Sequence, residues 1–163
     1  MTTEHDRGTI PTDHTGLRVL TFDECLLRLA ECPVGRFAFL NDGEIDVLPV
    51  NHTVDGLNIY FRTRGGSKIE AAVNSDRVSF EADSYDERAM DGWSVLVYGT
   101  AEIVEPKDIL RLEPIARDSW VPPDSSEMTW VRIRSAAITG RALRGDEAPG
   151  ALSTPSSGRT FEI

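Results

Sequence analysis

Residues 60–68 are Tyr60-Phe61-Arg62-Thr63-Arg64-Gly65-Gly66-Ser67-Lys68, and this stretch decides both the fold and the candidate site. Apolar side chains alternate with polar ones as the chain enters it, at Leu57, Ile59 and Phe61. Alternation with a period of two is typical of a β-strand, because successive side chains point to opposite faces. The two glycines that follow favour a tight turn, since glycine has no Cβ. The sequence therefore predicts a strand over 57–63 that ends in a turn.

A short helix is predicted directly after this turn, over Ser67–Val73. Ser67 is followed three residues later by Glu70, which is the pattern of a capping box. A strand, two glycines and a helix start would bring several backbone N–H groups to one place, and such groups bind anions.

The charges along this stretch favour the same interpretation. The chain has a formal net charge of −10, yet residues 56–69 contain no acid and include Arg62, Arg64 and Lys68. Arginine offers a planar fork of donors to phosphate oxygens, and lysine offers a point charge. We therefore predict a phosphate site here. The alternative is a solvated hairpin end with ordinary surface cations, because no P-loop or dinucleotide fingerprint is present.

Length and composition describe an ordinary globular protein. The 163 residues are enough for one domain with a real core, and 40% of them are hydrophobic. We expect a flexible arm over 1–18, a single domain over 19–143 and a flexible tail over 144–163, which is rich in Gly, Pro, Ser and Thr.

Several protein classes are excluded by the same composition. No run approaches the roughly 18 apolar residues of a membrane span, and residues 1–16 lack the apolar segment of a signal peptide. The acidic balance argues against nucleic acid as a partner. Cys25 and Cys32 are too few for a disulfide framework and lack metal-ligand partners at zinc spacing. We expect a cytoplasmic protein with reduced thiols and no bound metal.

The first helix is predicted to begin after Thr21 and to end before Pro33. Thr21 and Glu24 form a capping box pattern. Its buried face is predicted from helical spacing and consists of Phe22, Cys25, Leu26 and Leu29.

Six strands are predicted, mostly joined as neighbouring hairpins. They cover residues 36–40, 45–51, 57–63, 77–82, 93–104 and 129–138. Asn41-Asp42-Gly43 and Asp55-Gly56 are predicted hairpin turns. Pro49 indicates an interruption of the ladder or an edge, and Gly99 a bulge. A further helix is predicted over 106–116, with exposed loops over 83–92 and 121–126. This order predicts a mainly β protein, a small closed antiparallel barrel of six strands with short helices.

The chain resembles the pyridoxamine 5′-phosphate oxidase-like, FMN-binding split-barrel family, and within it a short bacterial branch that includes nitroimidazole-resistance-type proteins. The resemblance spans roughly residues 20–143. It rests on Val34-Gly35-Arg36-Phe37-Ala38, Leu48-Pro49-Val50-Asn51-His52, Tyr60-Phe61-Arg62-Thr63, Gly66-Ser67-Lys68, Gly92-Trp93-Ser94-Val95 and Val131-Arg132-Ile133. Pyridoxamine 5′-phosphate oxidase itself matches less well, because its C-terminal Arg-Leu-x-Pro ending is absent here.

This resemblance implies a homodimer with two flavin sites at the subunit interface. It implies that the FMN phosphate is held by Arg62, Thr63, Ser67 and Lys68. The isoalloxazine ring would lie along the backbone of Pro49, Val50 and Asn51. Trp93 and the last strand, including Arg132, would reach in from the partner.

Three of these residues have alternatives that the sequence leaves open. His52 follows the ring-lining segment and could donate a proton, since an unperturbed histidine has a pKa near 6.5; it could equally be hydrogen-bonded to backbone. Trp93 could flank the flavin or pack in the dimer core. Arg132 could support a phosphate or a substrate carboxylate, or could be a solvated strand charge.

The function favoured at this point is FMN-dependent oxidation or reduction of a small organic substrate. Absence of a recognisable nucleophile–base set is consistent with this, because a flavin supplies the reactive group itself. The alternatives are an F420-dependent reductase, whose phosphate would bind in the same place, and a non-catalytic flavin- or haem-binding module for storage or sensing.

Overall fold

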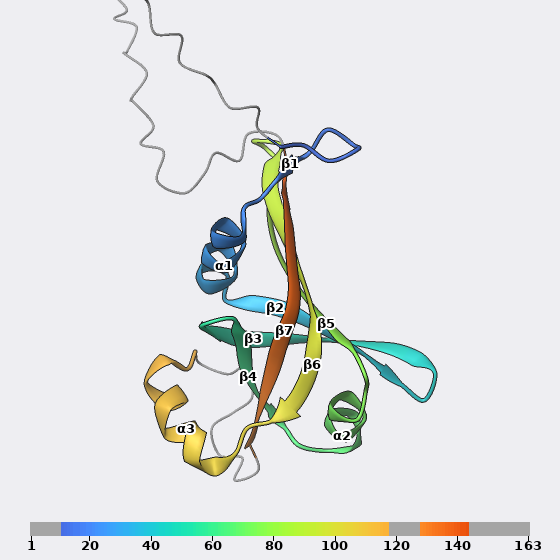
Figure 1. Cartoon of the computed structure of the whole chain (residues 1–163), viewed down its shortest axis with the longest axis vertical. Helices are drawn as coiled ribbons and strands as arrows, with labels where there is room; N and C mark the ends of the chain where they lie inside the picture. Colours follow the sequence, from blue (N-terminus) through green and yellow to red (C-terminus); the bar gives the residue numbers. More distant parts are fainter. Residues whose placement is uncertain (1–10, 118–127, 144–163) are drawn as a thin grey trace, which may run out of the picture.

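The computed structural model describes residues 11–117 and 128–143, apart from the side chain of Lys68. The elements in chain order are β1 (Arg18–Val19), α1 (Phe22–Glu31), β2 (Val34–Asn41), β3 (Glu44–Asp55), β4 (Asn58–Arg64), α2 (Ser67–Val73), β5 (Val78–Asp86), β6 (Asp91–Ile103), α3 (Pro106–Leu112), the 3₁₀ helix η1 (Glu113–Ile115) and β7 (Met128–Ala142). Figure 1 shows α1 and α3 on one side of the strands and α2 on the other.

Six strands close into a ring, in the order β7-β4-β3-β2-β5-β6 and back to β7. Every pairing is antiparallel. The long strand β7 closes the ring because its first half pairs with β4 and most of its length pairs with β6. The predicted six-stranded antiparallel barrel is confirmed, and the two-residue β1 adds to the far end of β7.

The hairpins follow the predicted turn residues. Asn41 pairs with Glu44, and between them Asp42 and Gly43 have φ values of +50° and +87°, as a two-residue turn of this kind requires. Pro49 pairs with Arg36 of β2, while β4 joins β3 only over His52–Asp55. The missing N–H of proline therefore lies where β3 is a local edge. The predicted bulge is also present, as a register shift at Tyr98/Gly99.

Helix α1 begins with the predicted capping box, in which Thr21 and Glu24 exchange hydrogen bonds. Cys25 and Leu29 are buried, as predicted. Phe22 is 49% exposed, so its predicted place in the buried face is wrong. The helix makes its close contact with the barrel one turn later, where a Cβ on Gly140 of β7 would lie 2.7 Å from Cys25 Sγ.

Two further local predictions are corrected. Ser67 is the first residue of α2 and not its cap; the N-cap is Gly66, and no side chain caps this helix. Residues 83–92 do not form a loop throughout, because Asp83–Asp86 pair with residues 91–94 as the end of a β5–β6 hairpin. The predicted loop over 121–126 and the tail from residue 144 lie outside the described residues.

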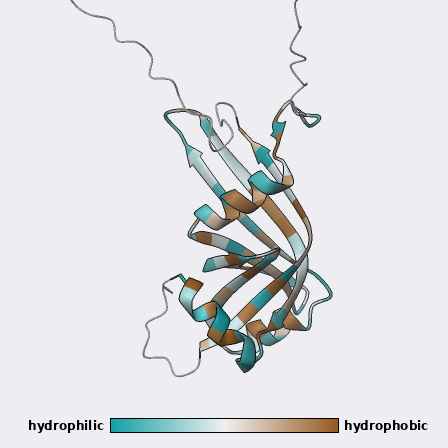
Figure 2. Ribbon diagram, turned by 60° about the vertical axis from the view of Figure 1, so that its left-hand side comes forward, coloured by the Kyte–Doolittle hydropathy of each residue, from teal (hydrophilic) through white to brown (hydrophobic). Residues whose placement is uncertain are grey.

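The interior of the barrel contains the main hydrophobic core, which includes Phe37, Phe61, Phe80 and Val97. A second, smaller cluster lies outside the ring, where α3 covers β4 and β7: Tyr60, Val104, Leu112 and Trp130. Strand β4 is therefore buried on both faces at its centre. Figure 2 shows hydrophobic and hydrophilic segments alternating along the strands.

The described part of the predicted arm contacts the barrel. Thr12 pairs with Arg18, and Arg141 of β7 donates to the Asp13 carboxylate at 2.8 Å. Asp13 also accepts hydrogen bonds from Thr15, and these contacts hold the pKa of Asp13 well below its usual value.

Candidate functional site

A groove of about 320 Å³ lies where β4 ends and α2 begins. It is lined by Leu48, Thr63, Arg64, Gly65, Gly66, Ser67 and Ile69. Two of the predicted phosphate ligands, Thr63 and Ser67, are thus brought together. Lys68 is in the first turn of α2, but its side chain lies outside the described part of the chain.

The local sequence explains this arrangement. Gly66 has a φ of +139°, which side chains other than hydrogen rarely allow, and this conformation lets the chain turn from β4 into α2. Hydroxyl groups come from Thr63 and Ser67, a guanidinium from Arg64, and an apolar wall from Leu48 and Ile69. No carboxylate is among the residues that line the groove. The groove can therefore accept an anionic group at one end and an apolar group beside it.

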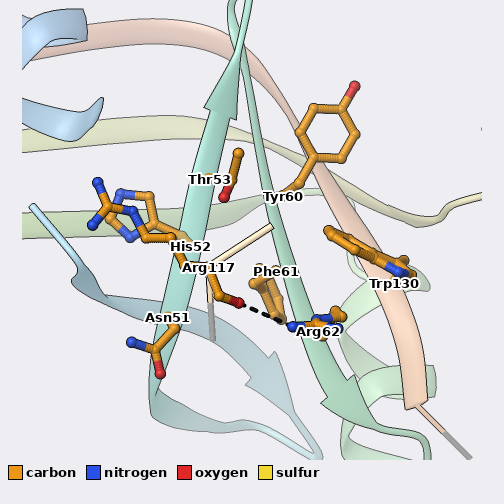
Figure 3. Close-up of a pocket in the computed structure, with 8 residues that line it drawn as sticks. All are labelled: Asn51, His52, Thr53, Tyr60, Phe61, Arg62, Arg117 and Trp130. Carbon is orange, nitrogen blue, oxygen red and sulfur yellow. Dashed lines mark hydrogen bonds between the residues drawn. The ribbon is translucent and has the colours of Figure 1, made fainter. Parts of the chain in front are cut away.

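Arg62 does not line this groove. Its side chain borders a separate, water-sized cavity of about 10 Å³, shown in Figure 3. Its guanidinium donates to the Arg117 carbonyl at 3.0 Å and lies 5.4 Å from the centre of the Trp130 ring. One N–H group of Arg62 is thus bonded away from the groove, and the expected contact of Arg62 with phosphate stays a prediction.

His52 borders the same cavity and is 1% exposed. Its Nε2 lies 2.8 Å from the carbonyl oxygen of Leu29, so Nε2 carries the proton and donates it. Burial and the nearby Arg117 charge lower the pKa of His52 to about 4, although the hydrogen bond to Leu29 acts in the opposite direction. The pKa of His52 is thus well below the value of an unperturbed histidine, and the structure shows the backbone-bonded alternative.

The predicted ring-lining segment lies on β3 beside the groove. Pro49 is exposed and Val50 is buried. The Asn51 amide donates to the Pro33 carbonyl at 3.3 Å. Only Leu48, one residue earlier, has a side chain in the groove.

Trp93 and Arg132 lie away from the groove in the same chain. Trp93 is 7% exposed and packs under Arg28, whose guanidinium is 5.6 Å from its ring. It pairs with Ala142 at one end of β7, whereas Arg62 pairs with Trp130 near the other. These positions are 12 residues apart, or on the order of 40 Å along an extended strand. The expected contribution of Trp93 to a site in a partner subunit stays a prediction.

Arg132 is held by an acid that sequence reasoning missed. The Glu102 carboxylate on β6 accepts from Arg132 and, at 2.6 Å, from Arg134. These hydrogen bonds lower the pKa of Glu102, although burial opposes them. Glu102 could be found only from the β6–β7 register, which places it opposite Arg132.

Within 11–117 and 128–143, no group of three or more His, Cys, Asp or Glu side chains could hold a metal ion. None of the helices described is long and apolar enough to cross a membrane.

Comparison with known proteins gives consistent results. The profile of a family described as pyridoxamine 5′-phosphate oxidase matches residues 21–142. An uncharacterized protein of Mycobacterium tuberculosis is 33% identical over 130 residues, which cover 76% of this chain and 84% of that protein.

Solved structures agree with this match. A candidate pyridoxamine 5′-phosphate oxidase from Corynebacterium glutamicum has 34% sequence identity and a TM-score of 0.66, covering 80% of this chain and 96% of its own. An FAD-binding protein from Mycobacterium smegmatis has 32% identity and a TM-score of 0.64, covering 77% of this chain and 97% of its own.

Proposed function

The chain belongs to the pyridoxamine 5′-phosphate oxidase family, and from this premise we propose that it binds a flavin nucleotide in the groove between β4 and α2. FMN is the smaller of the two flavin nucleotides, and it is the ligand expected from the sequence. FAD contains the same riboflavin phosphate unit. The similar protein from M. smegmatis is an FAD-binding protein, which supports a flavin without deciding between the two nucleotides.

The observation that carries the proposal is the composition of the groove. Thr63, Arg64 and Ser67 place two hydroxyl groups and a permanent cation around one end, with no acid among the lining residues. In the described ranges, no carboxylate forms an ion pair with Arg64. Phosphate oxygens would therefore meet the Arg64 guanidinium and the Ser67 hydroxyl. The Thr63 hydroxyl, which donates to the Arg64 carbonyl at 3.3 Å, would turn to the phosphate on binding, and Lys68 is expected to add a second cation.

The size of the groove supports a site shared by two subunits. Ligand pockets are commonly about 300–1,000 Å³, so 320 Å³ is at the small end and would hold only part of a flavin. We propose that a second copy of the chain completes it. The β2–β3 hairpin beside the groove exposes three aliphatic side chains, Leu40 (55%), Ile45 (75%) and Val47 (55%). Leu40 and Ile45 are cross-strand partners, and Val47 precedes the groove residue Leu48.

The proposed activity is oxidation or reduction of a small organic substrate. When bound, the flavin would supply hydride transfer. The chain's own residues would hold the phosphate at Thr63, Arg64 and Ser67, and Leu48 and Ile69 would exclude water from the adjacent apolar wall. His52 is not suited to proton donation near neutral pH, because it is buried and neutral.

The absorption spectrum of freshly purified protein tests this proposal. A two-band flavin spectrum is expected, followed by saturable binding when the stripped protein is titrated with FMN and with FAD. A deazaflavin band would favour the F420-dependent reductase, and a Soret band would favour a haem-binding module. Absence of binding to both flavins would refute the proposal. Turnover would then be tested by anaerobic reduction of the bound flavin and reoxidation by candidate substrates.

A further inference from the structure

Residues 113–117, which comprise η1 and the two residues after it, form a strap across β3 and β4. Three hydrogen bonds hold it. The Thr53 hydroxyl on β3 donates to the Ile115 carbonyl at 2.9 Å, and Arg62 on β4 donates to the Arg117 carbonyl at 3.0 Å. The Arg117 guanidinium in turn donates to the Ala30 carbonyl at the end of α1. Figure 3 shows Arg117 and Arg62 joined by the second of these bonds.

His52 is linked to the same helix end. The last carbonyls of a helix have no intrahelical partner. In α1, His52 donates to the Leu29 carbonyl, and Arg117 donates to the next one along the chain. A neutral imidazole and a permanent cation are therefore fixed on consecutive carbonyls, and both border one water-sized cavity.

The surroundings of His52 offer nothing to balance a second positive charge. The charged groups that border its cavity are Arg117 from the strap and Arg62 from β4, and no carboxylate lines it. From α1 it receives the Leu29 carbonyl, and from β5 it is packed by the Phe80 ring, whose centre lies 4.8 Å from the centre of the imidazole. A protonated His52 would thus be a buried cation close to the Arg117 guanidinium, with no carboxylate to balance it.

We propose that protonation of His52 releases the strap, so that residues 113–117 form an acid-sensitive latch on the outer face of β3 and β4. The proton would be accepted at Nδ1, the nitrogen that makes no hydrogen bond within the described residues. The added charge is relieved when Arg117 leaves Ala30 and water enters the cavity. This latch does not depend on the proposed flavin site.

Proton linkage gives the expected size of the effect. The pKa of His52 is about 4 when the strap is closed, against 6.5 for an ordinary histidine. If the open state restores the ordinary value, acidification from about pH 7.5 to about pH 5 raises the open population by up to about 30-fold. The opening constant should rise with a slope near one per pH unit between these two pKa values, because one proton is taken up.

Hydrogen exchange of the full-length protein measures this population. Protection factors are compared at the two pH values for a peptide covering the strap and for a β6 peptide containing Val97, which is fully buried. The strap is expected to be less protected than β6 and to lose about tenfold or more of its protection at the lower pH. The matched control is His52→Gln, which can still donate to Leu29 but cannot titrate; its strap should show less than a twofold change.

Three outcomes would overturn the proposal: a change below twofold in the wild type, an equal loss in the control, or a strap as protected as β6 at both pH values. If the control does not fold, the wild type alone decides, because a pH slope near zero between 6.5 and 4 refutes uptake of a proton by the open state.

Discussion

Replacing Arg64 with glutamine removes the guanidinium at the rim of the groove and keeps a side chain of similar polarity. The residue is exposed, which limits its contribution to phosphate binding. An exposed ion pair contributes roughly 0.2–1 kcal/mol, and a hydrogen bond to a charged group roughly 1.5–3 kcal/mol. We place Arg64 between these ranges, at about 1–1.5 kcal/mol. Because about 1.4 kcal/mol is a factor of ten, the Kd for FMN should rise about 5- to 10-fold.

The matched control is Arg62→Gln, two residues earlier on the same face of β4. This substitution removes the hydrogen bond from Arg62 to the Arg117 carbonyl and the contact of its guanidinium with the Trp130 ring. Together these two interactions contribute about 1–2.5 kcal/mol to the free energy of unfolding. This variant should unfold at lower urea concentration. Its preference for FMN over riboflavin, which lacks the phosphate, should be unchanged.

Titration of FMN and riboflavin into both variants and the wild type provides the measurement. The informative quantity is the ratio of the two Kd values, because a change in fold affects both ligands alike. The reasoning is refuted if Arg62→Gln lowers the ratio of riboflavin Kd to FMN Kd while Arg64→Gln leaves it unchanged. That result would restore the phosphate role that the sequence assigns to Arg62.

Three further predictions concern the turn, the subunit contact and pH. Gly66→Ala should lower the free energy of unfolding by about 1–3 kcal/mol and weaken FMN binding, because a φ of +139° is strained for alanine. Gly65→Ala is the control in urea unfolding, since its Cβ would meet only Thr129 Oγ1 at 3.3 Å. Val47→Asp should shift sedimentation from dimer to monomer and weaken flavin binding, and a variant that stays dimeric would exclude this hairpin as the contact. The free energy of unfolding should fall by about 3 kcal/mol between pH 6.5 and pH 4, because His52 binds its proton more weakly in the folded protein than in the unfolded chain. The stabilisation by neutral His52 is fully present above pH 6.5. Equal urea midpoints at pH 6.5 and pH 4 would contradict this prediction.

The strands and turns could be predicted because the signals for them are local. Asp42-Gly43 specifies a two-residue hairpin by its backbone preference alone, and Thr21 with Glu24 specifies a helix start by direct hydrogen bonds. The family could also be identified, because its motifs occur in order along most of the chain. These features need no knowledge of what lies across the barrel.

One error is local: Ser67 and Glu70 have capping-box spacing, but the turn from β4 makes Gly66 the cap. Other features were missed because a distant element decides them. The interaction of Glu102 with Arg132 depends on the β6–β7 register, which no local pattern reveals. The pKa of His52 is lowered by burial and by Arg117, 65 residues away in the chain. Sequence spacing predicts contacts within one element, whereas these contacts join elements that only the closed barrel brings together.

Strand β4 shows why two arginines of the same motif have different chemistry. Tyr60, Arg62 and Arg64 share its outer face, because side chains two apart point the same way. Residues of α3, η1 and β7 cover Tyr60 and Arg62, so Arg62 has a carbonyl acceptor and an aromatic ring that satisfy a partly buried cation. Arg64 lies where β4 ends, beyond that cover and beside the groove. Phosphate binding requires donors that are not already bonded, and among the residues that line the groove the Arg64 guanidinium and the Ser67 hydroxyl are such donors, whereas the Thr63 hydroxyl donates to the Arg64 carbonyl at 3.3 Å.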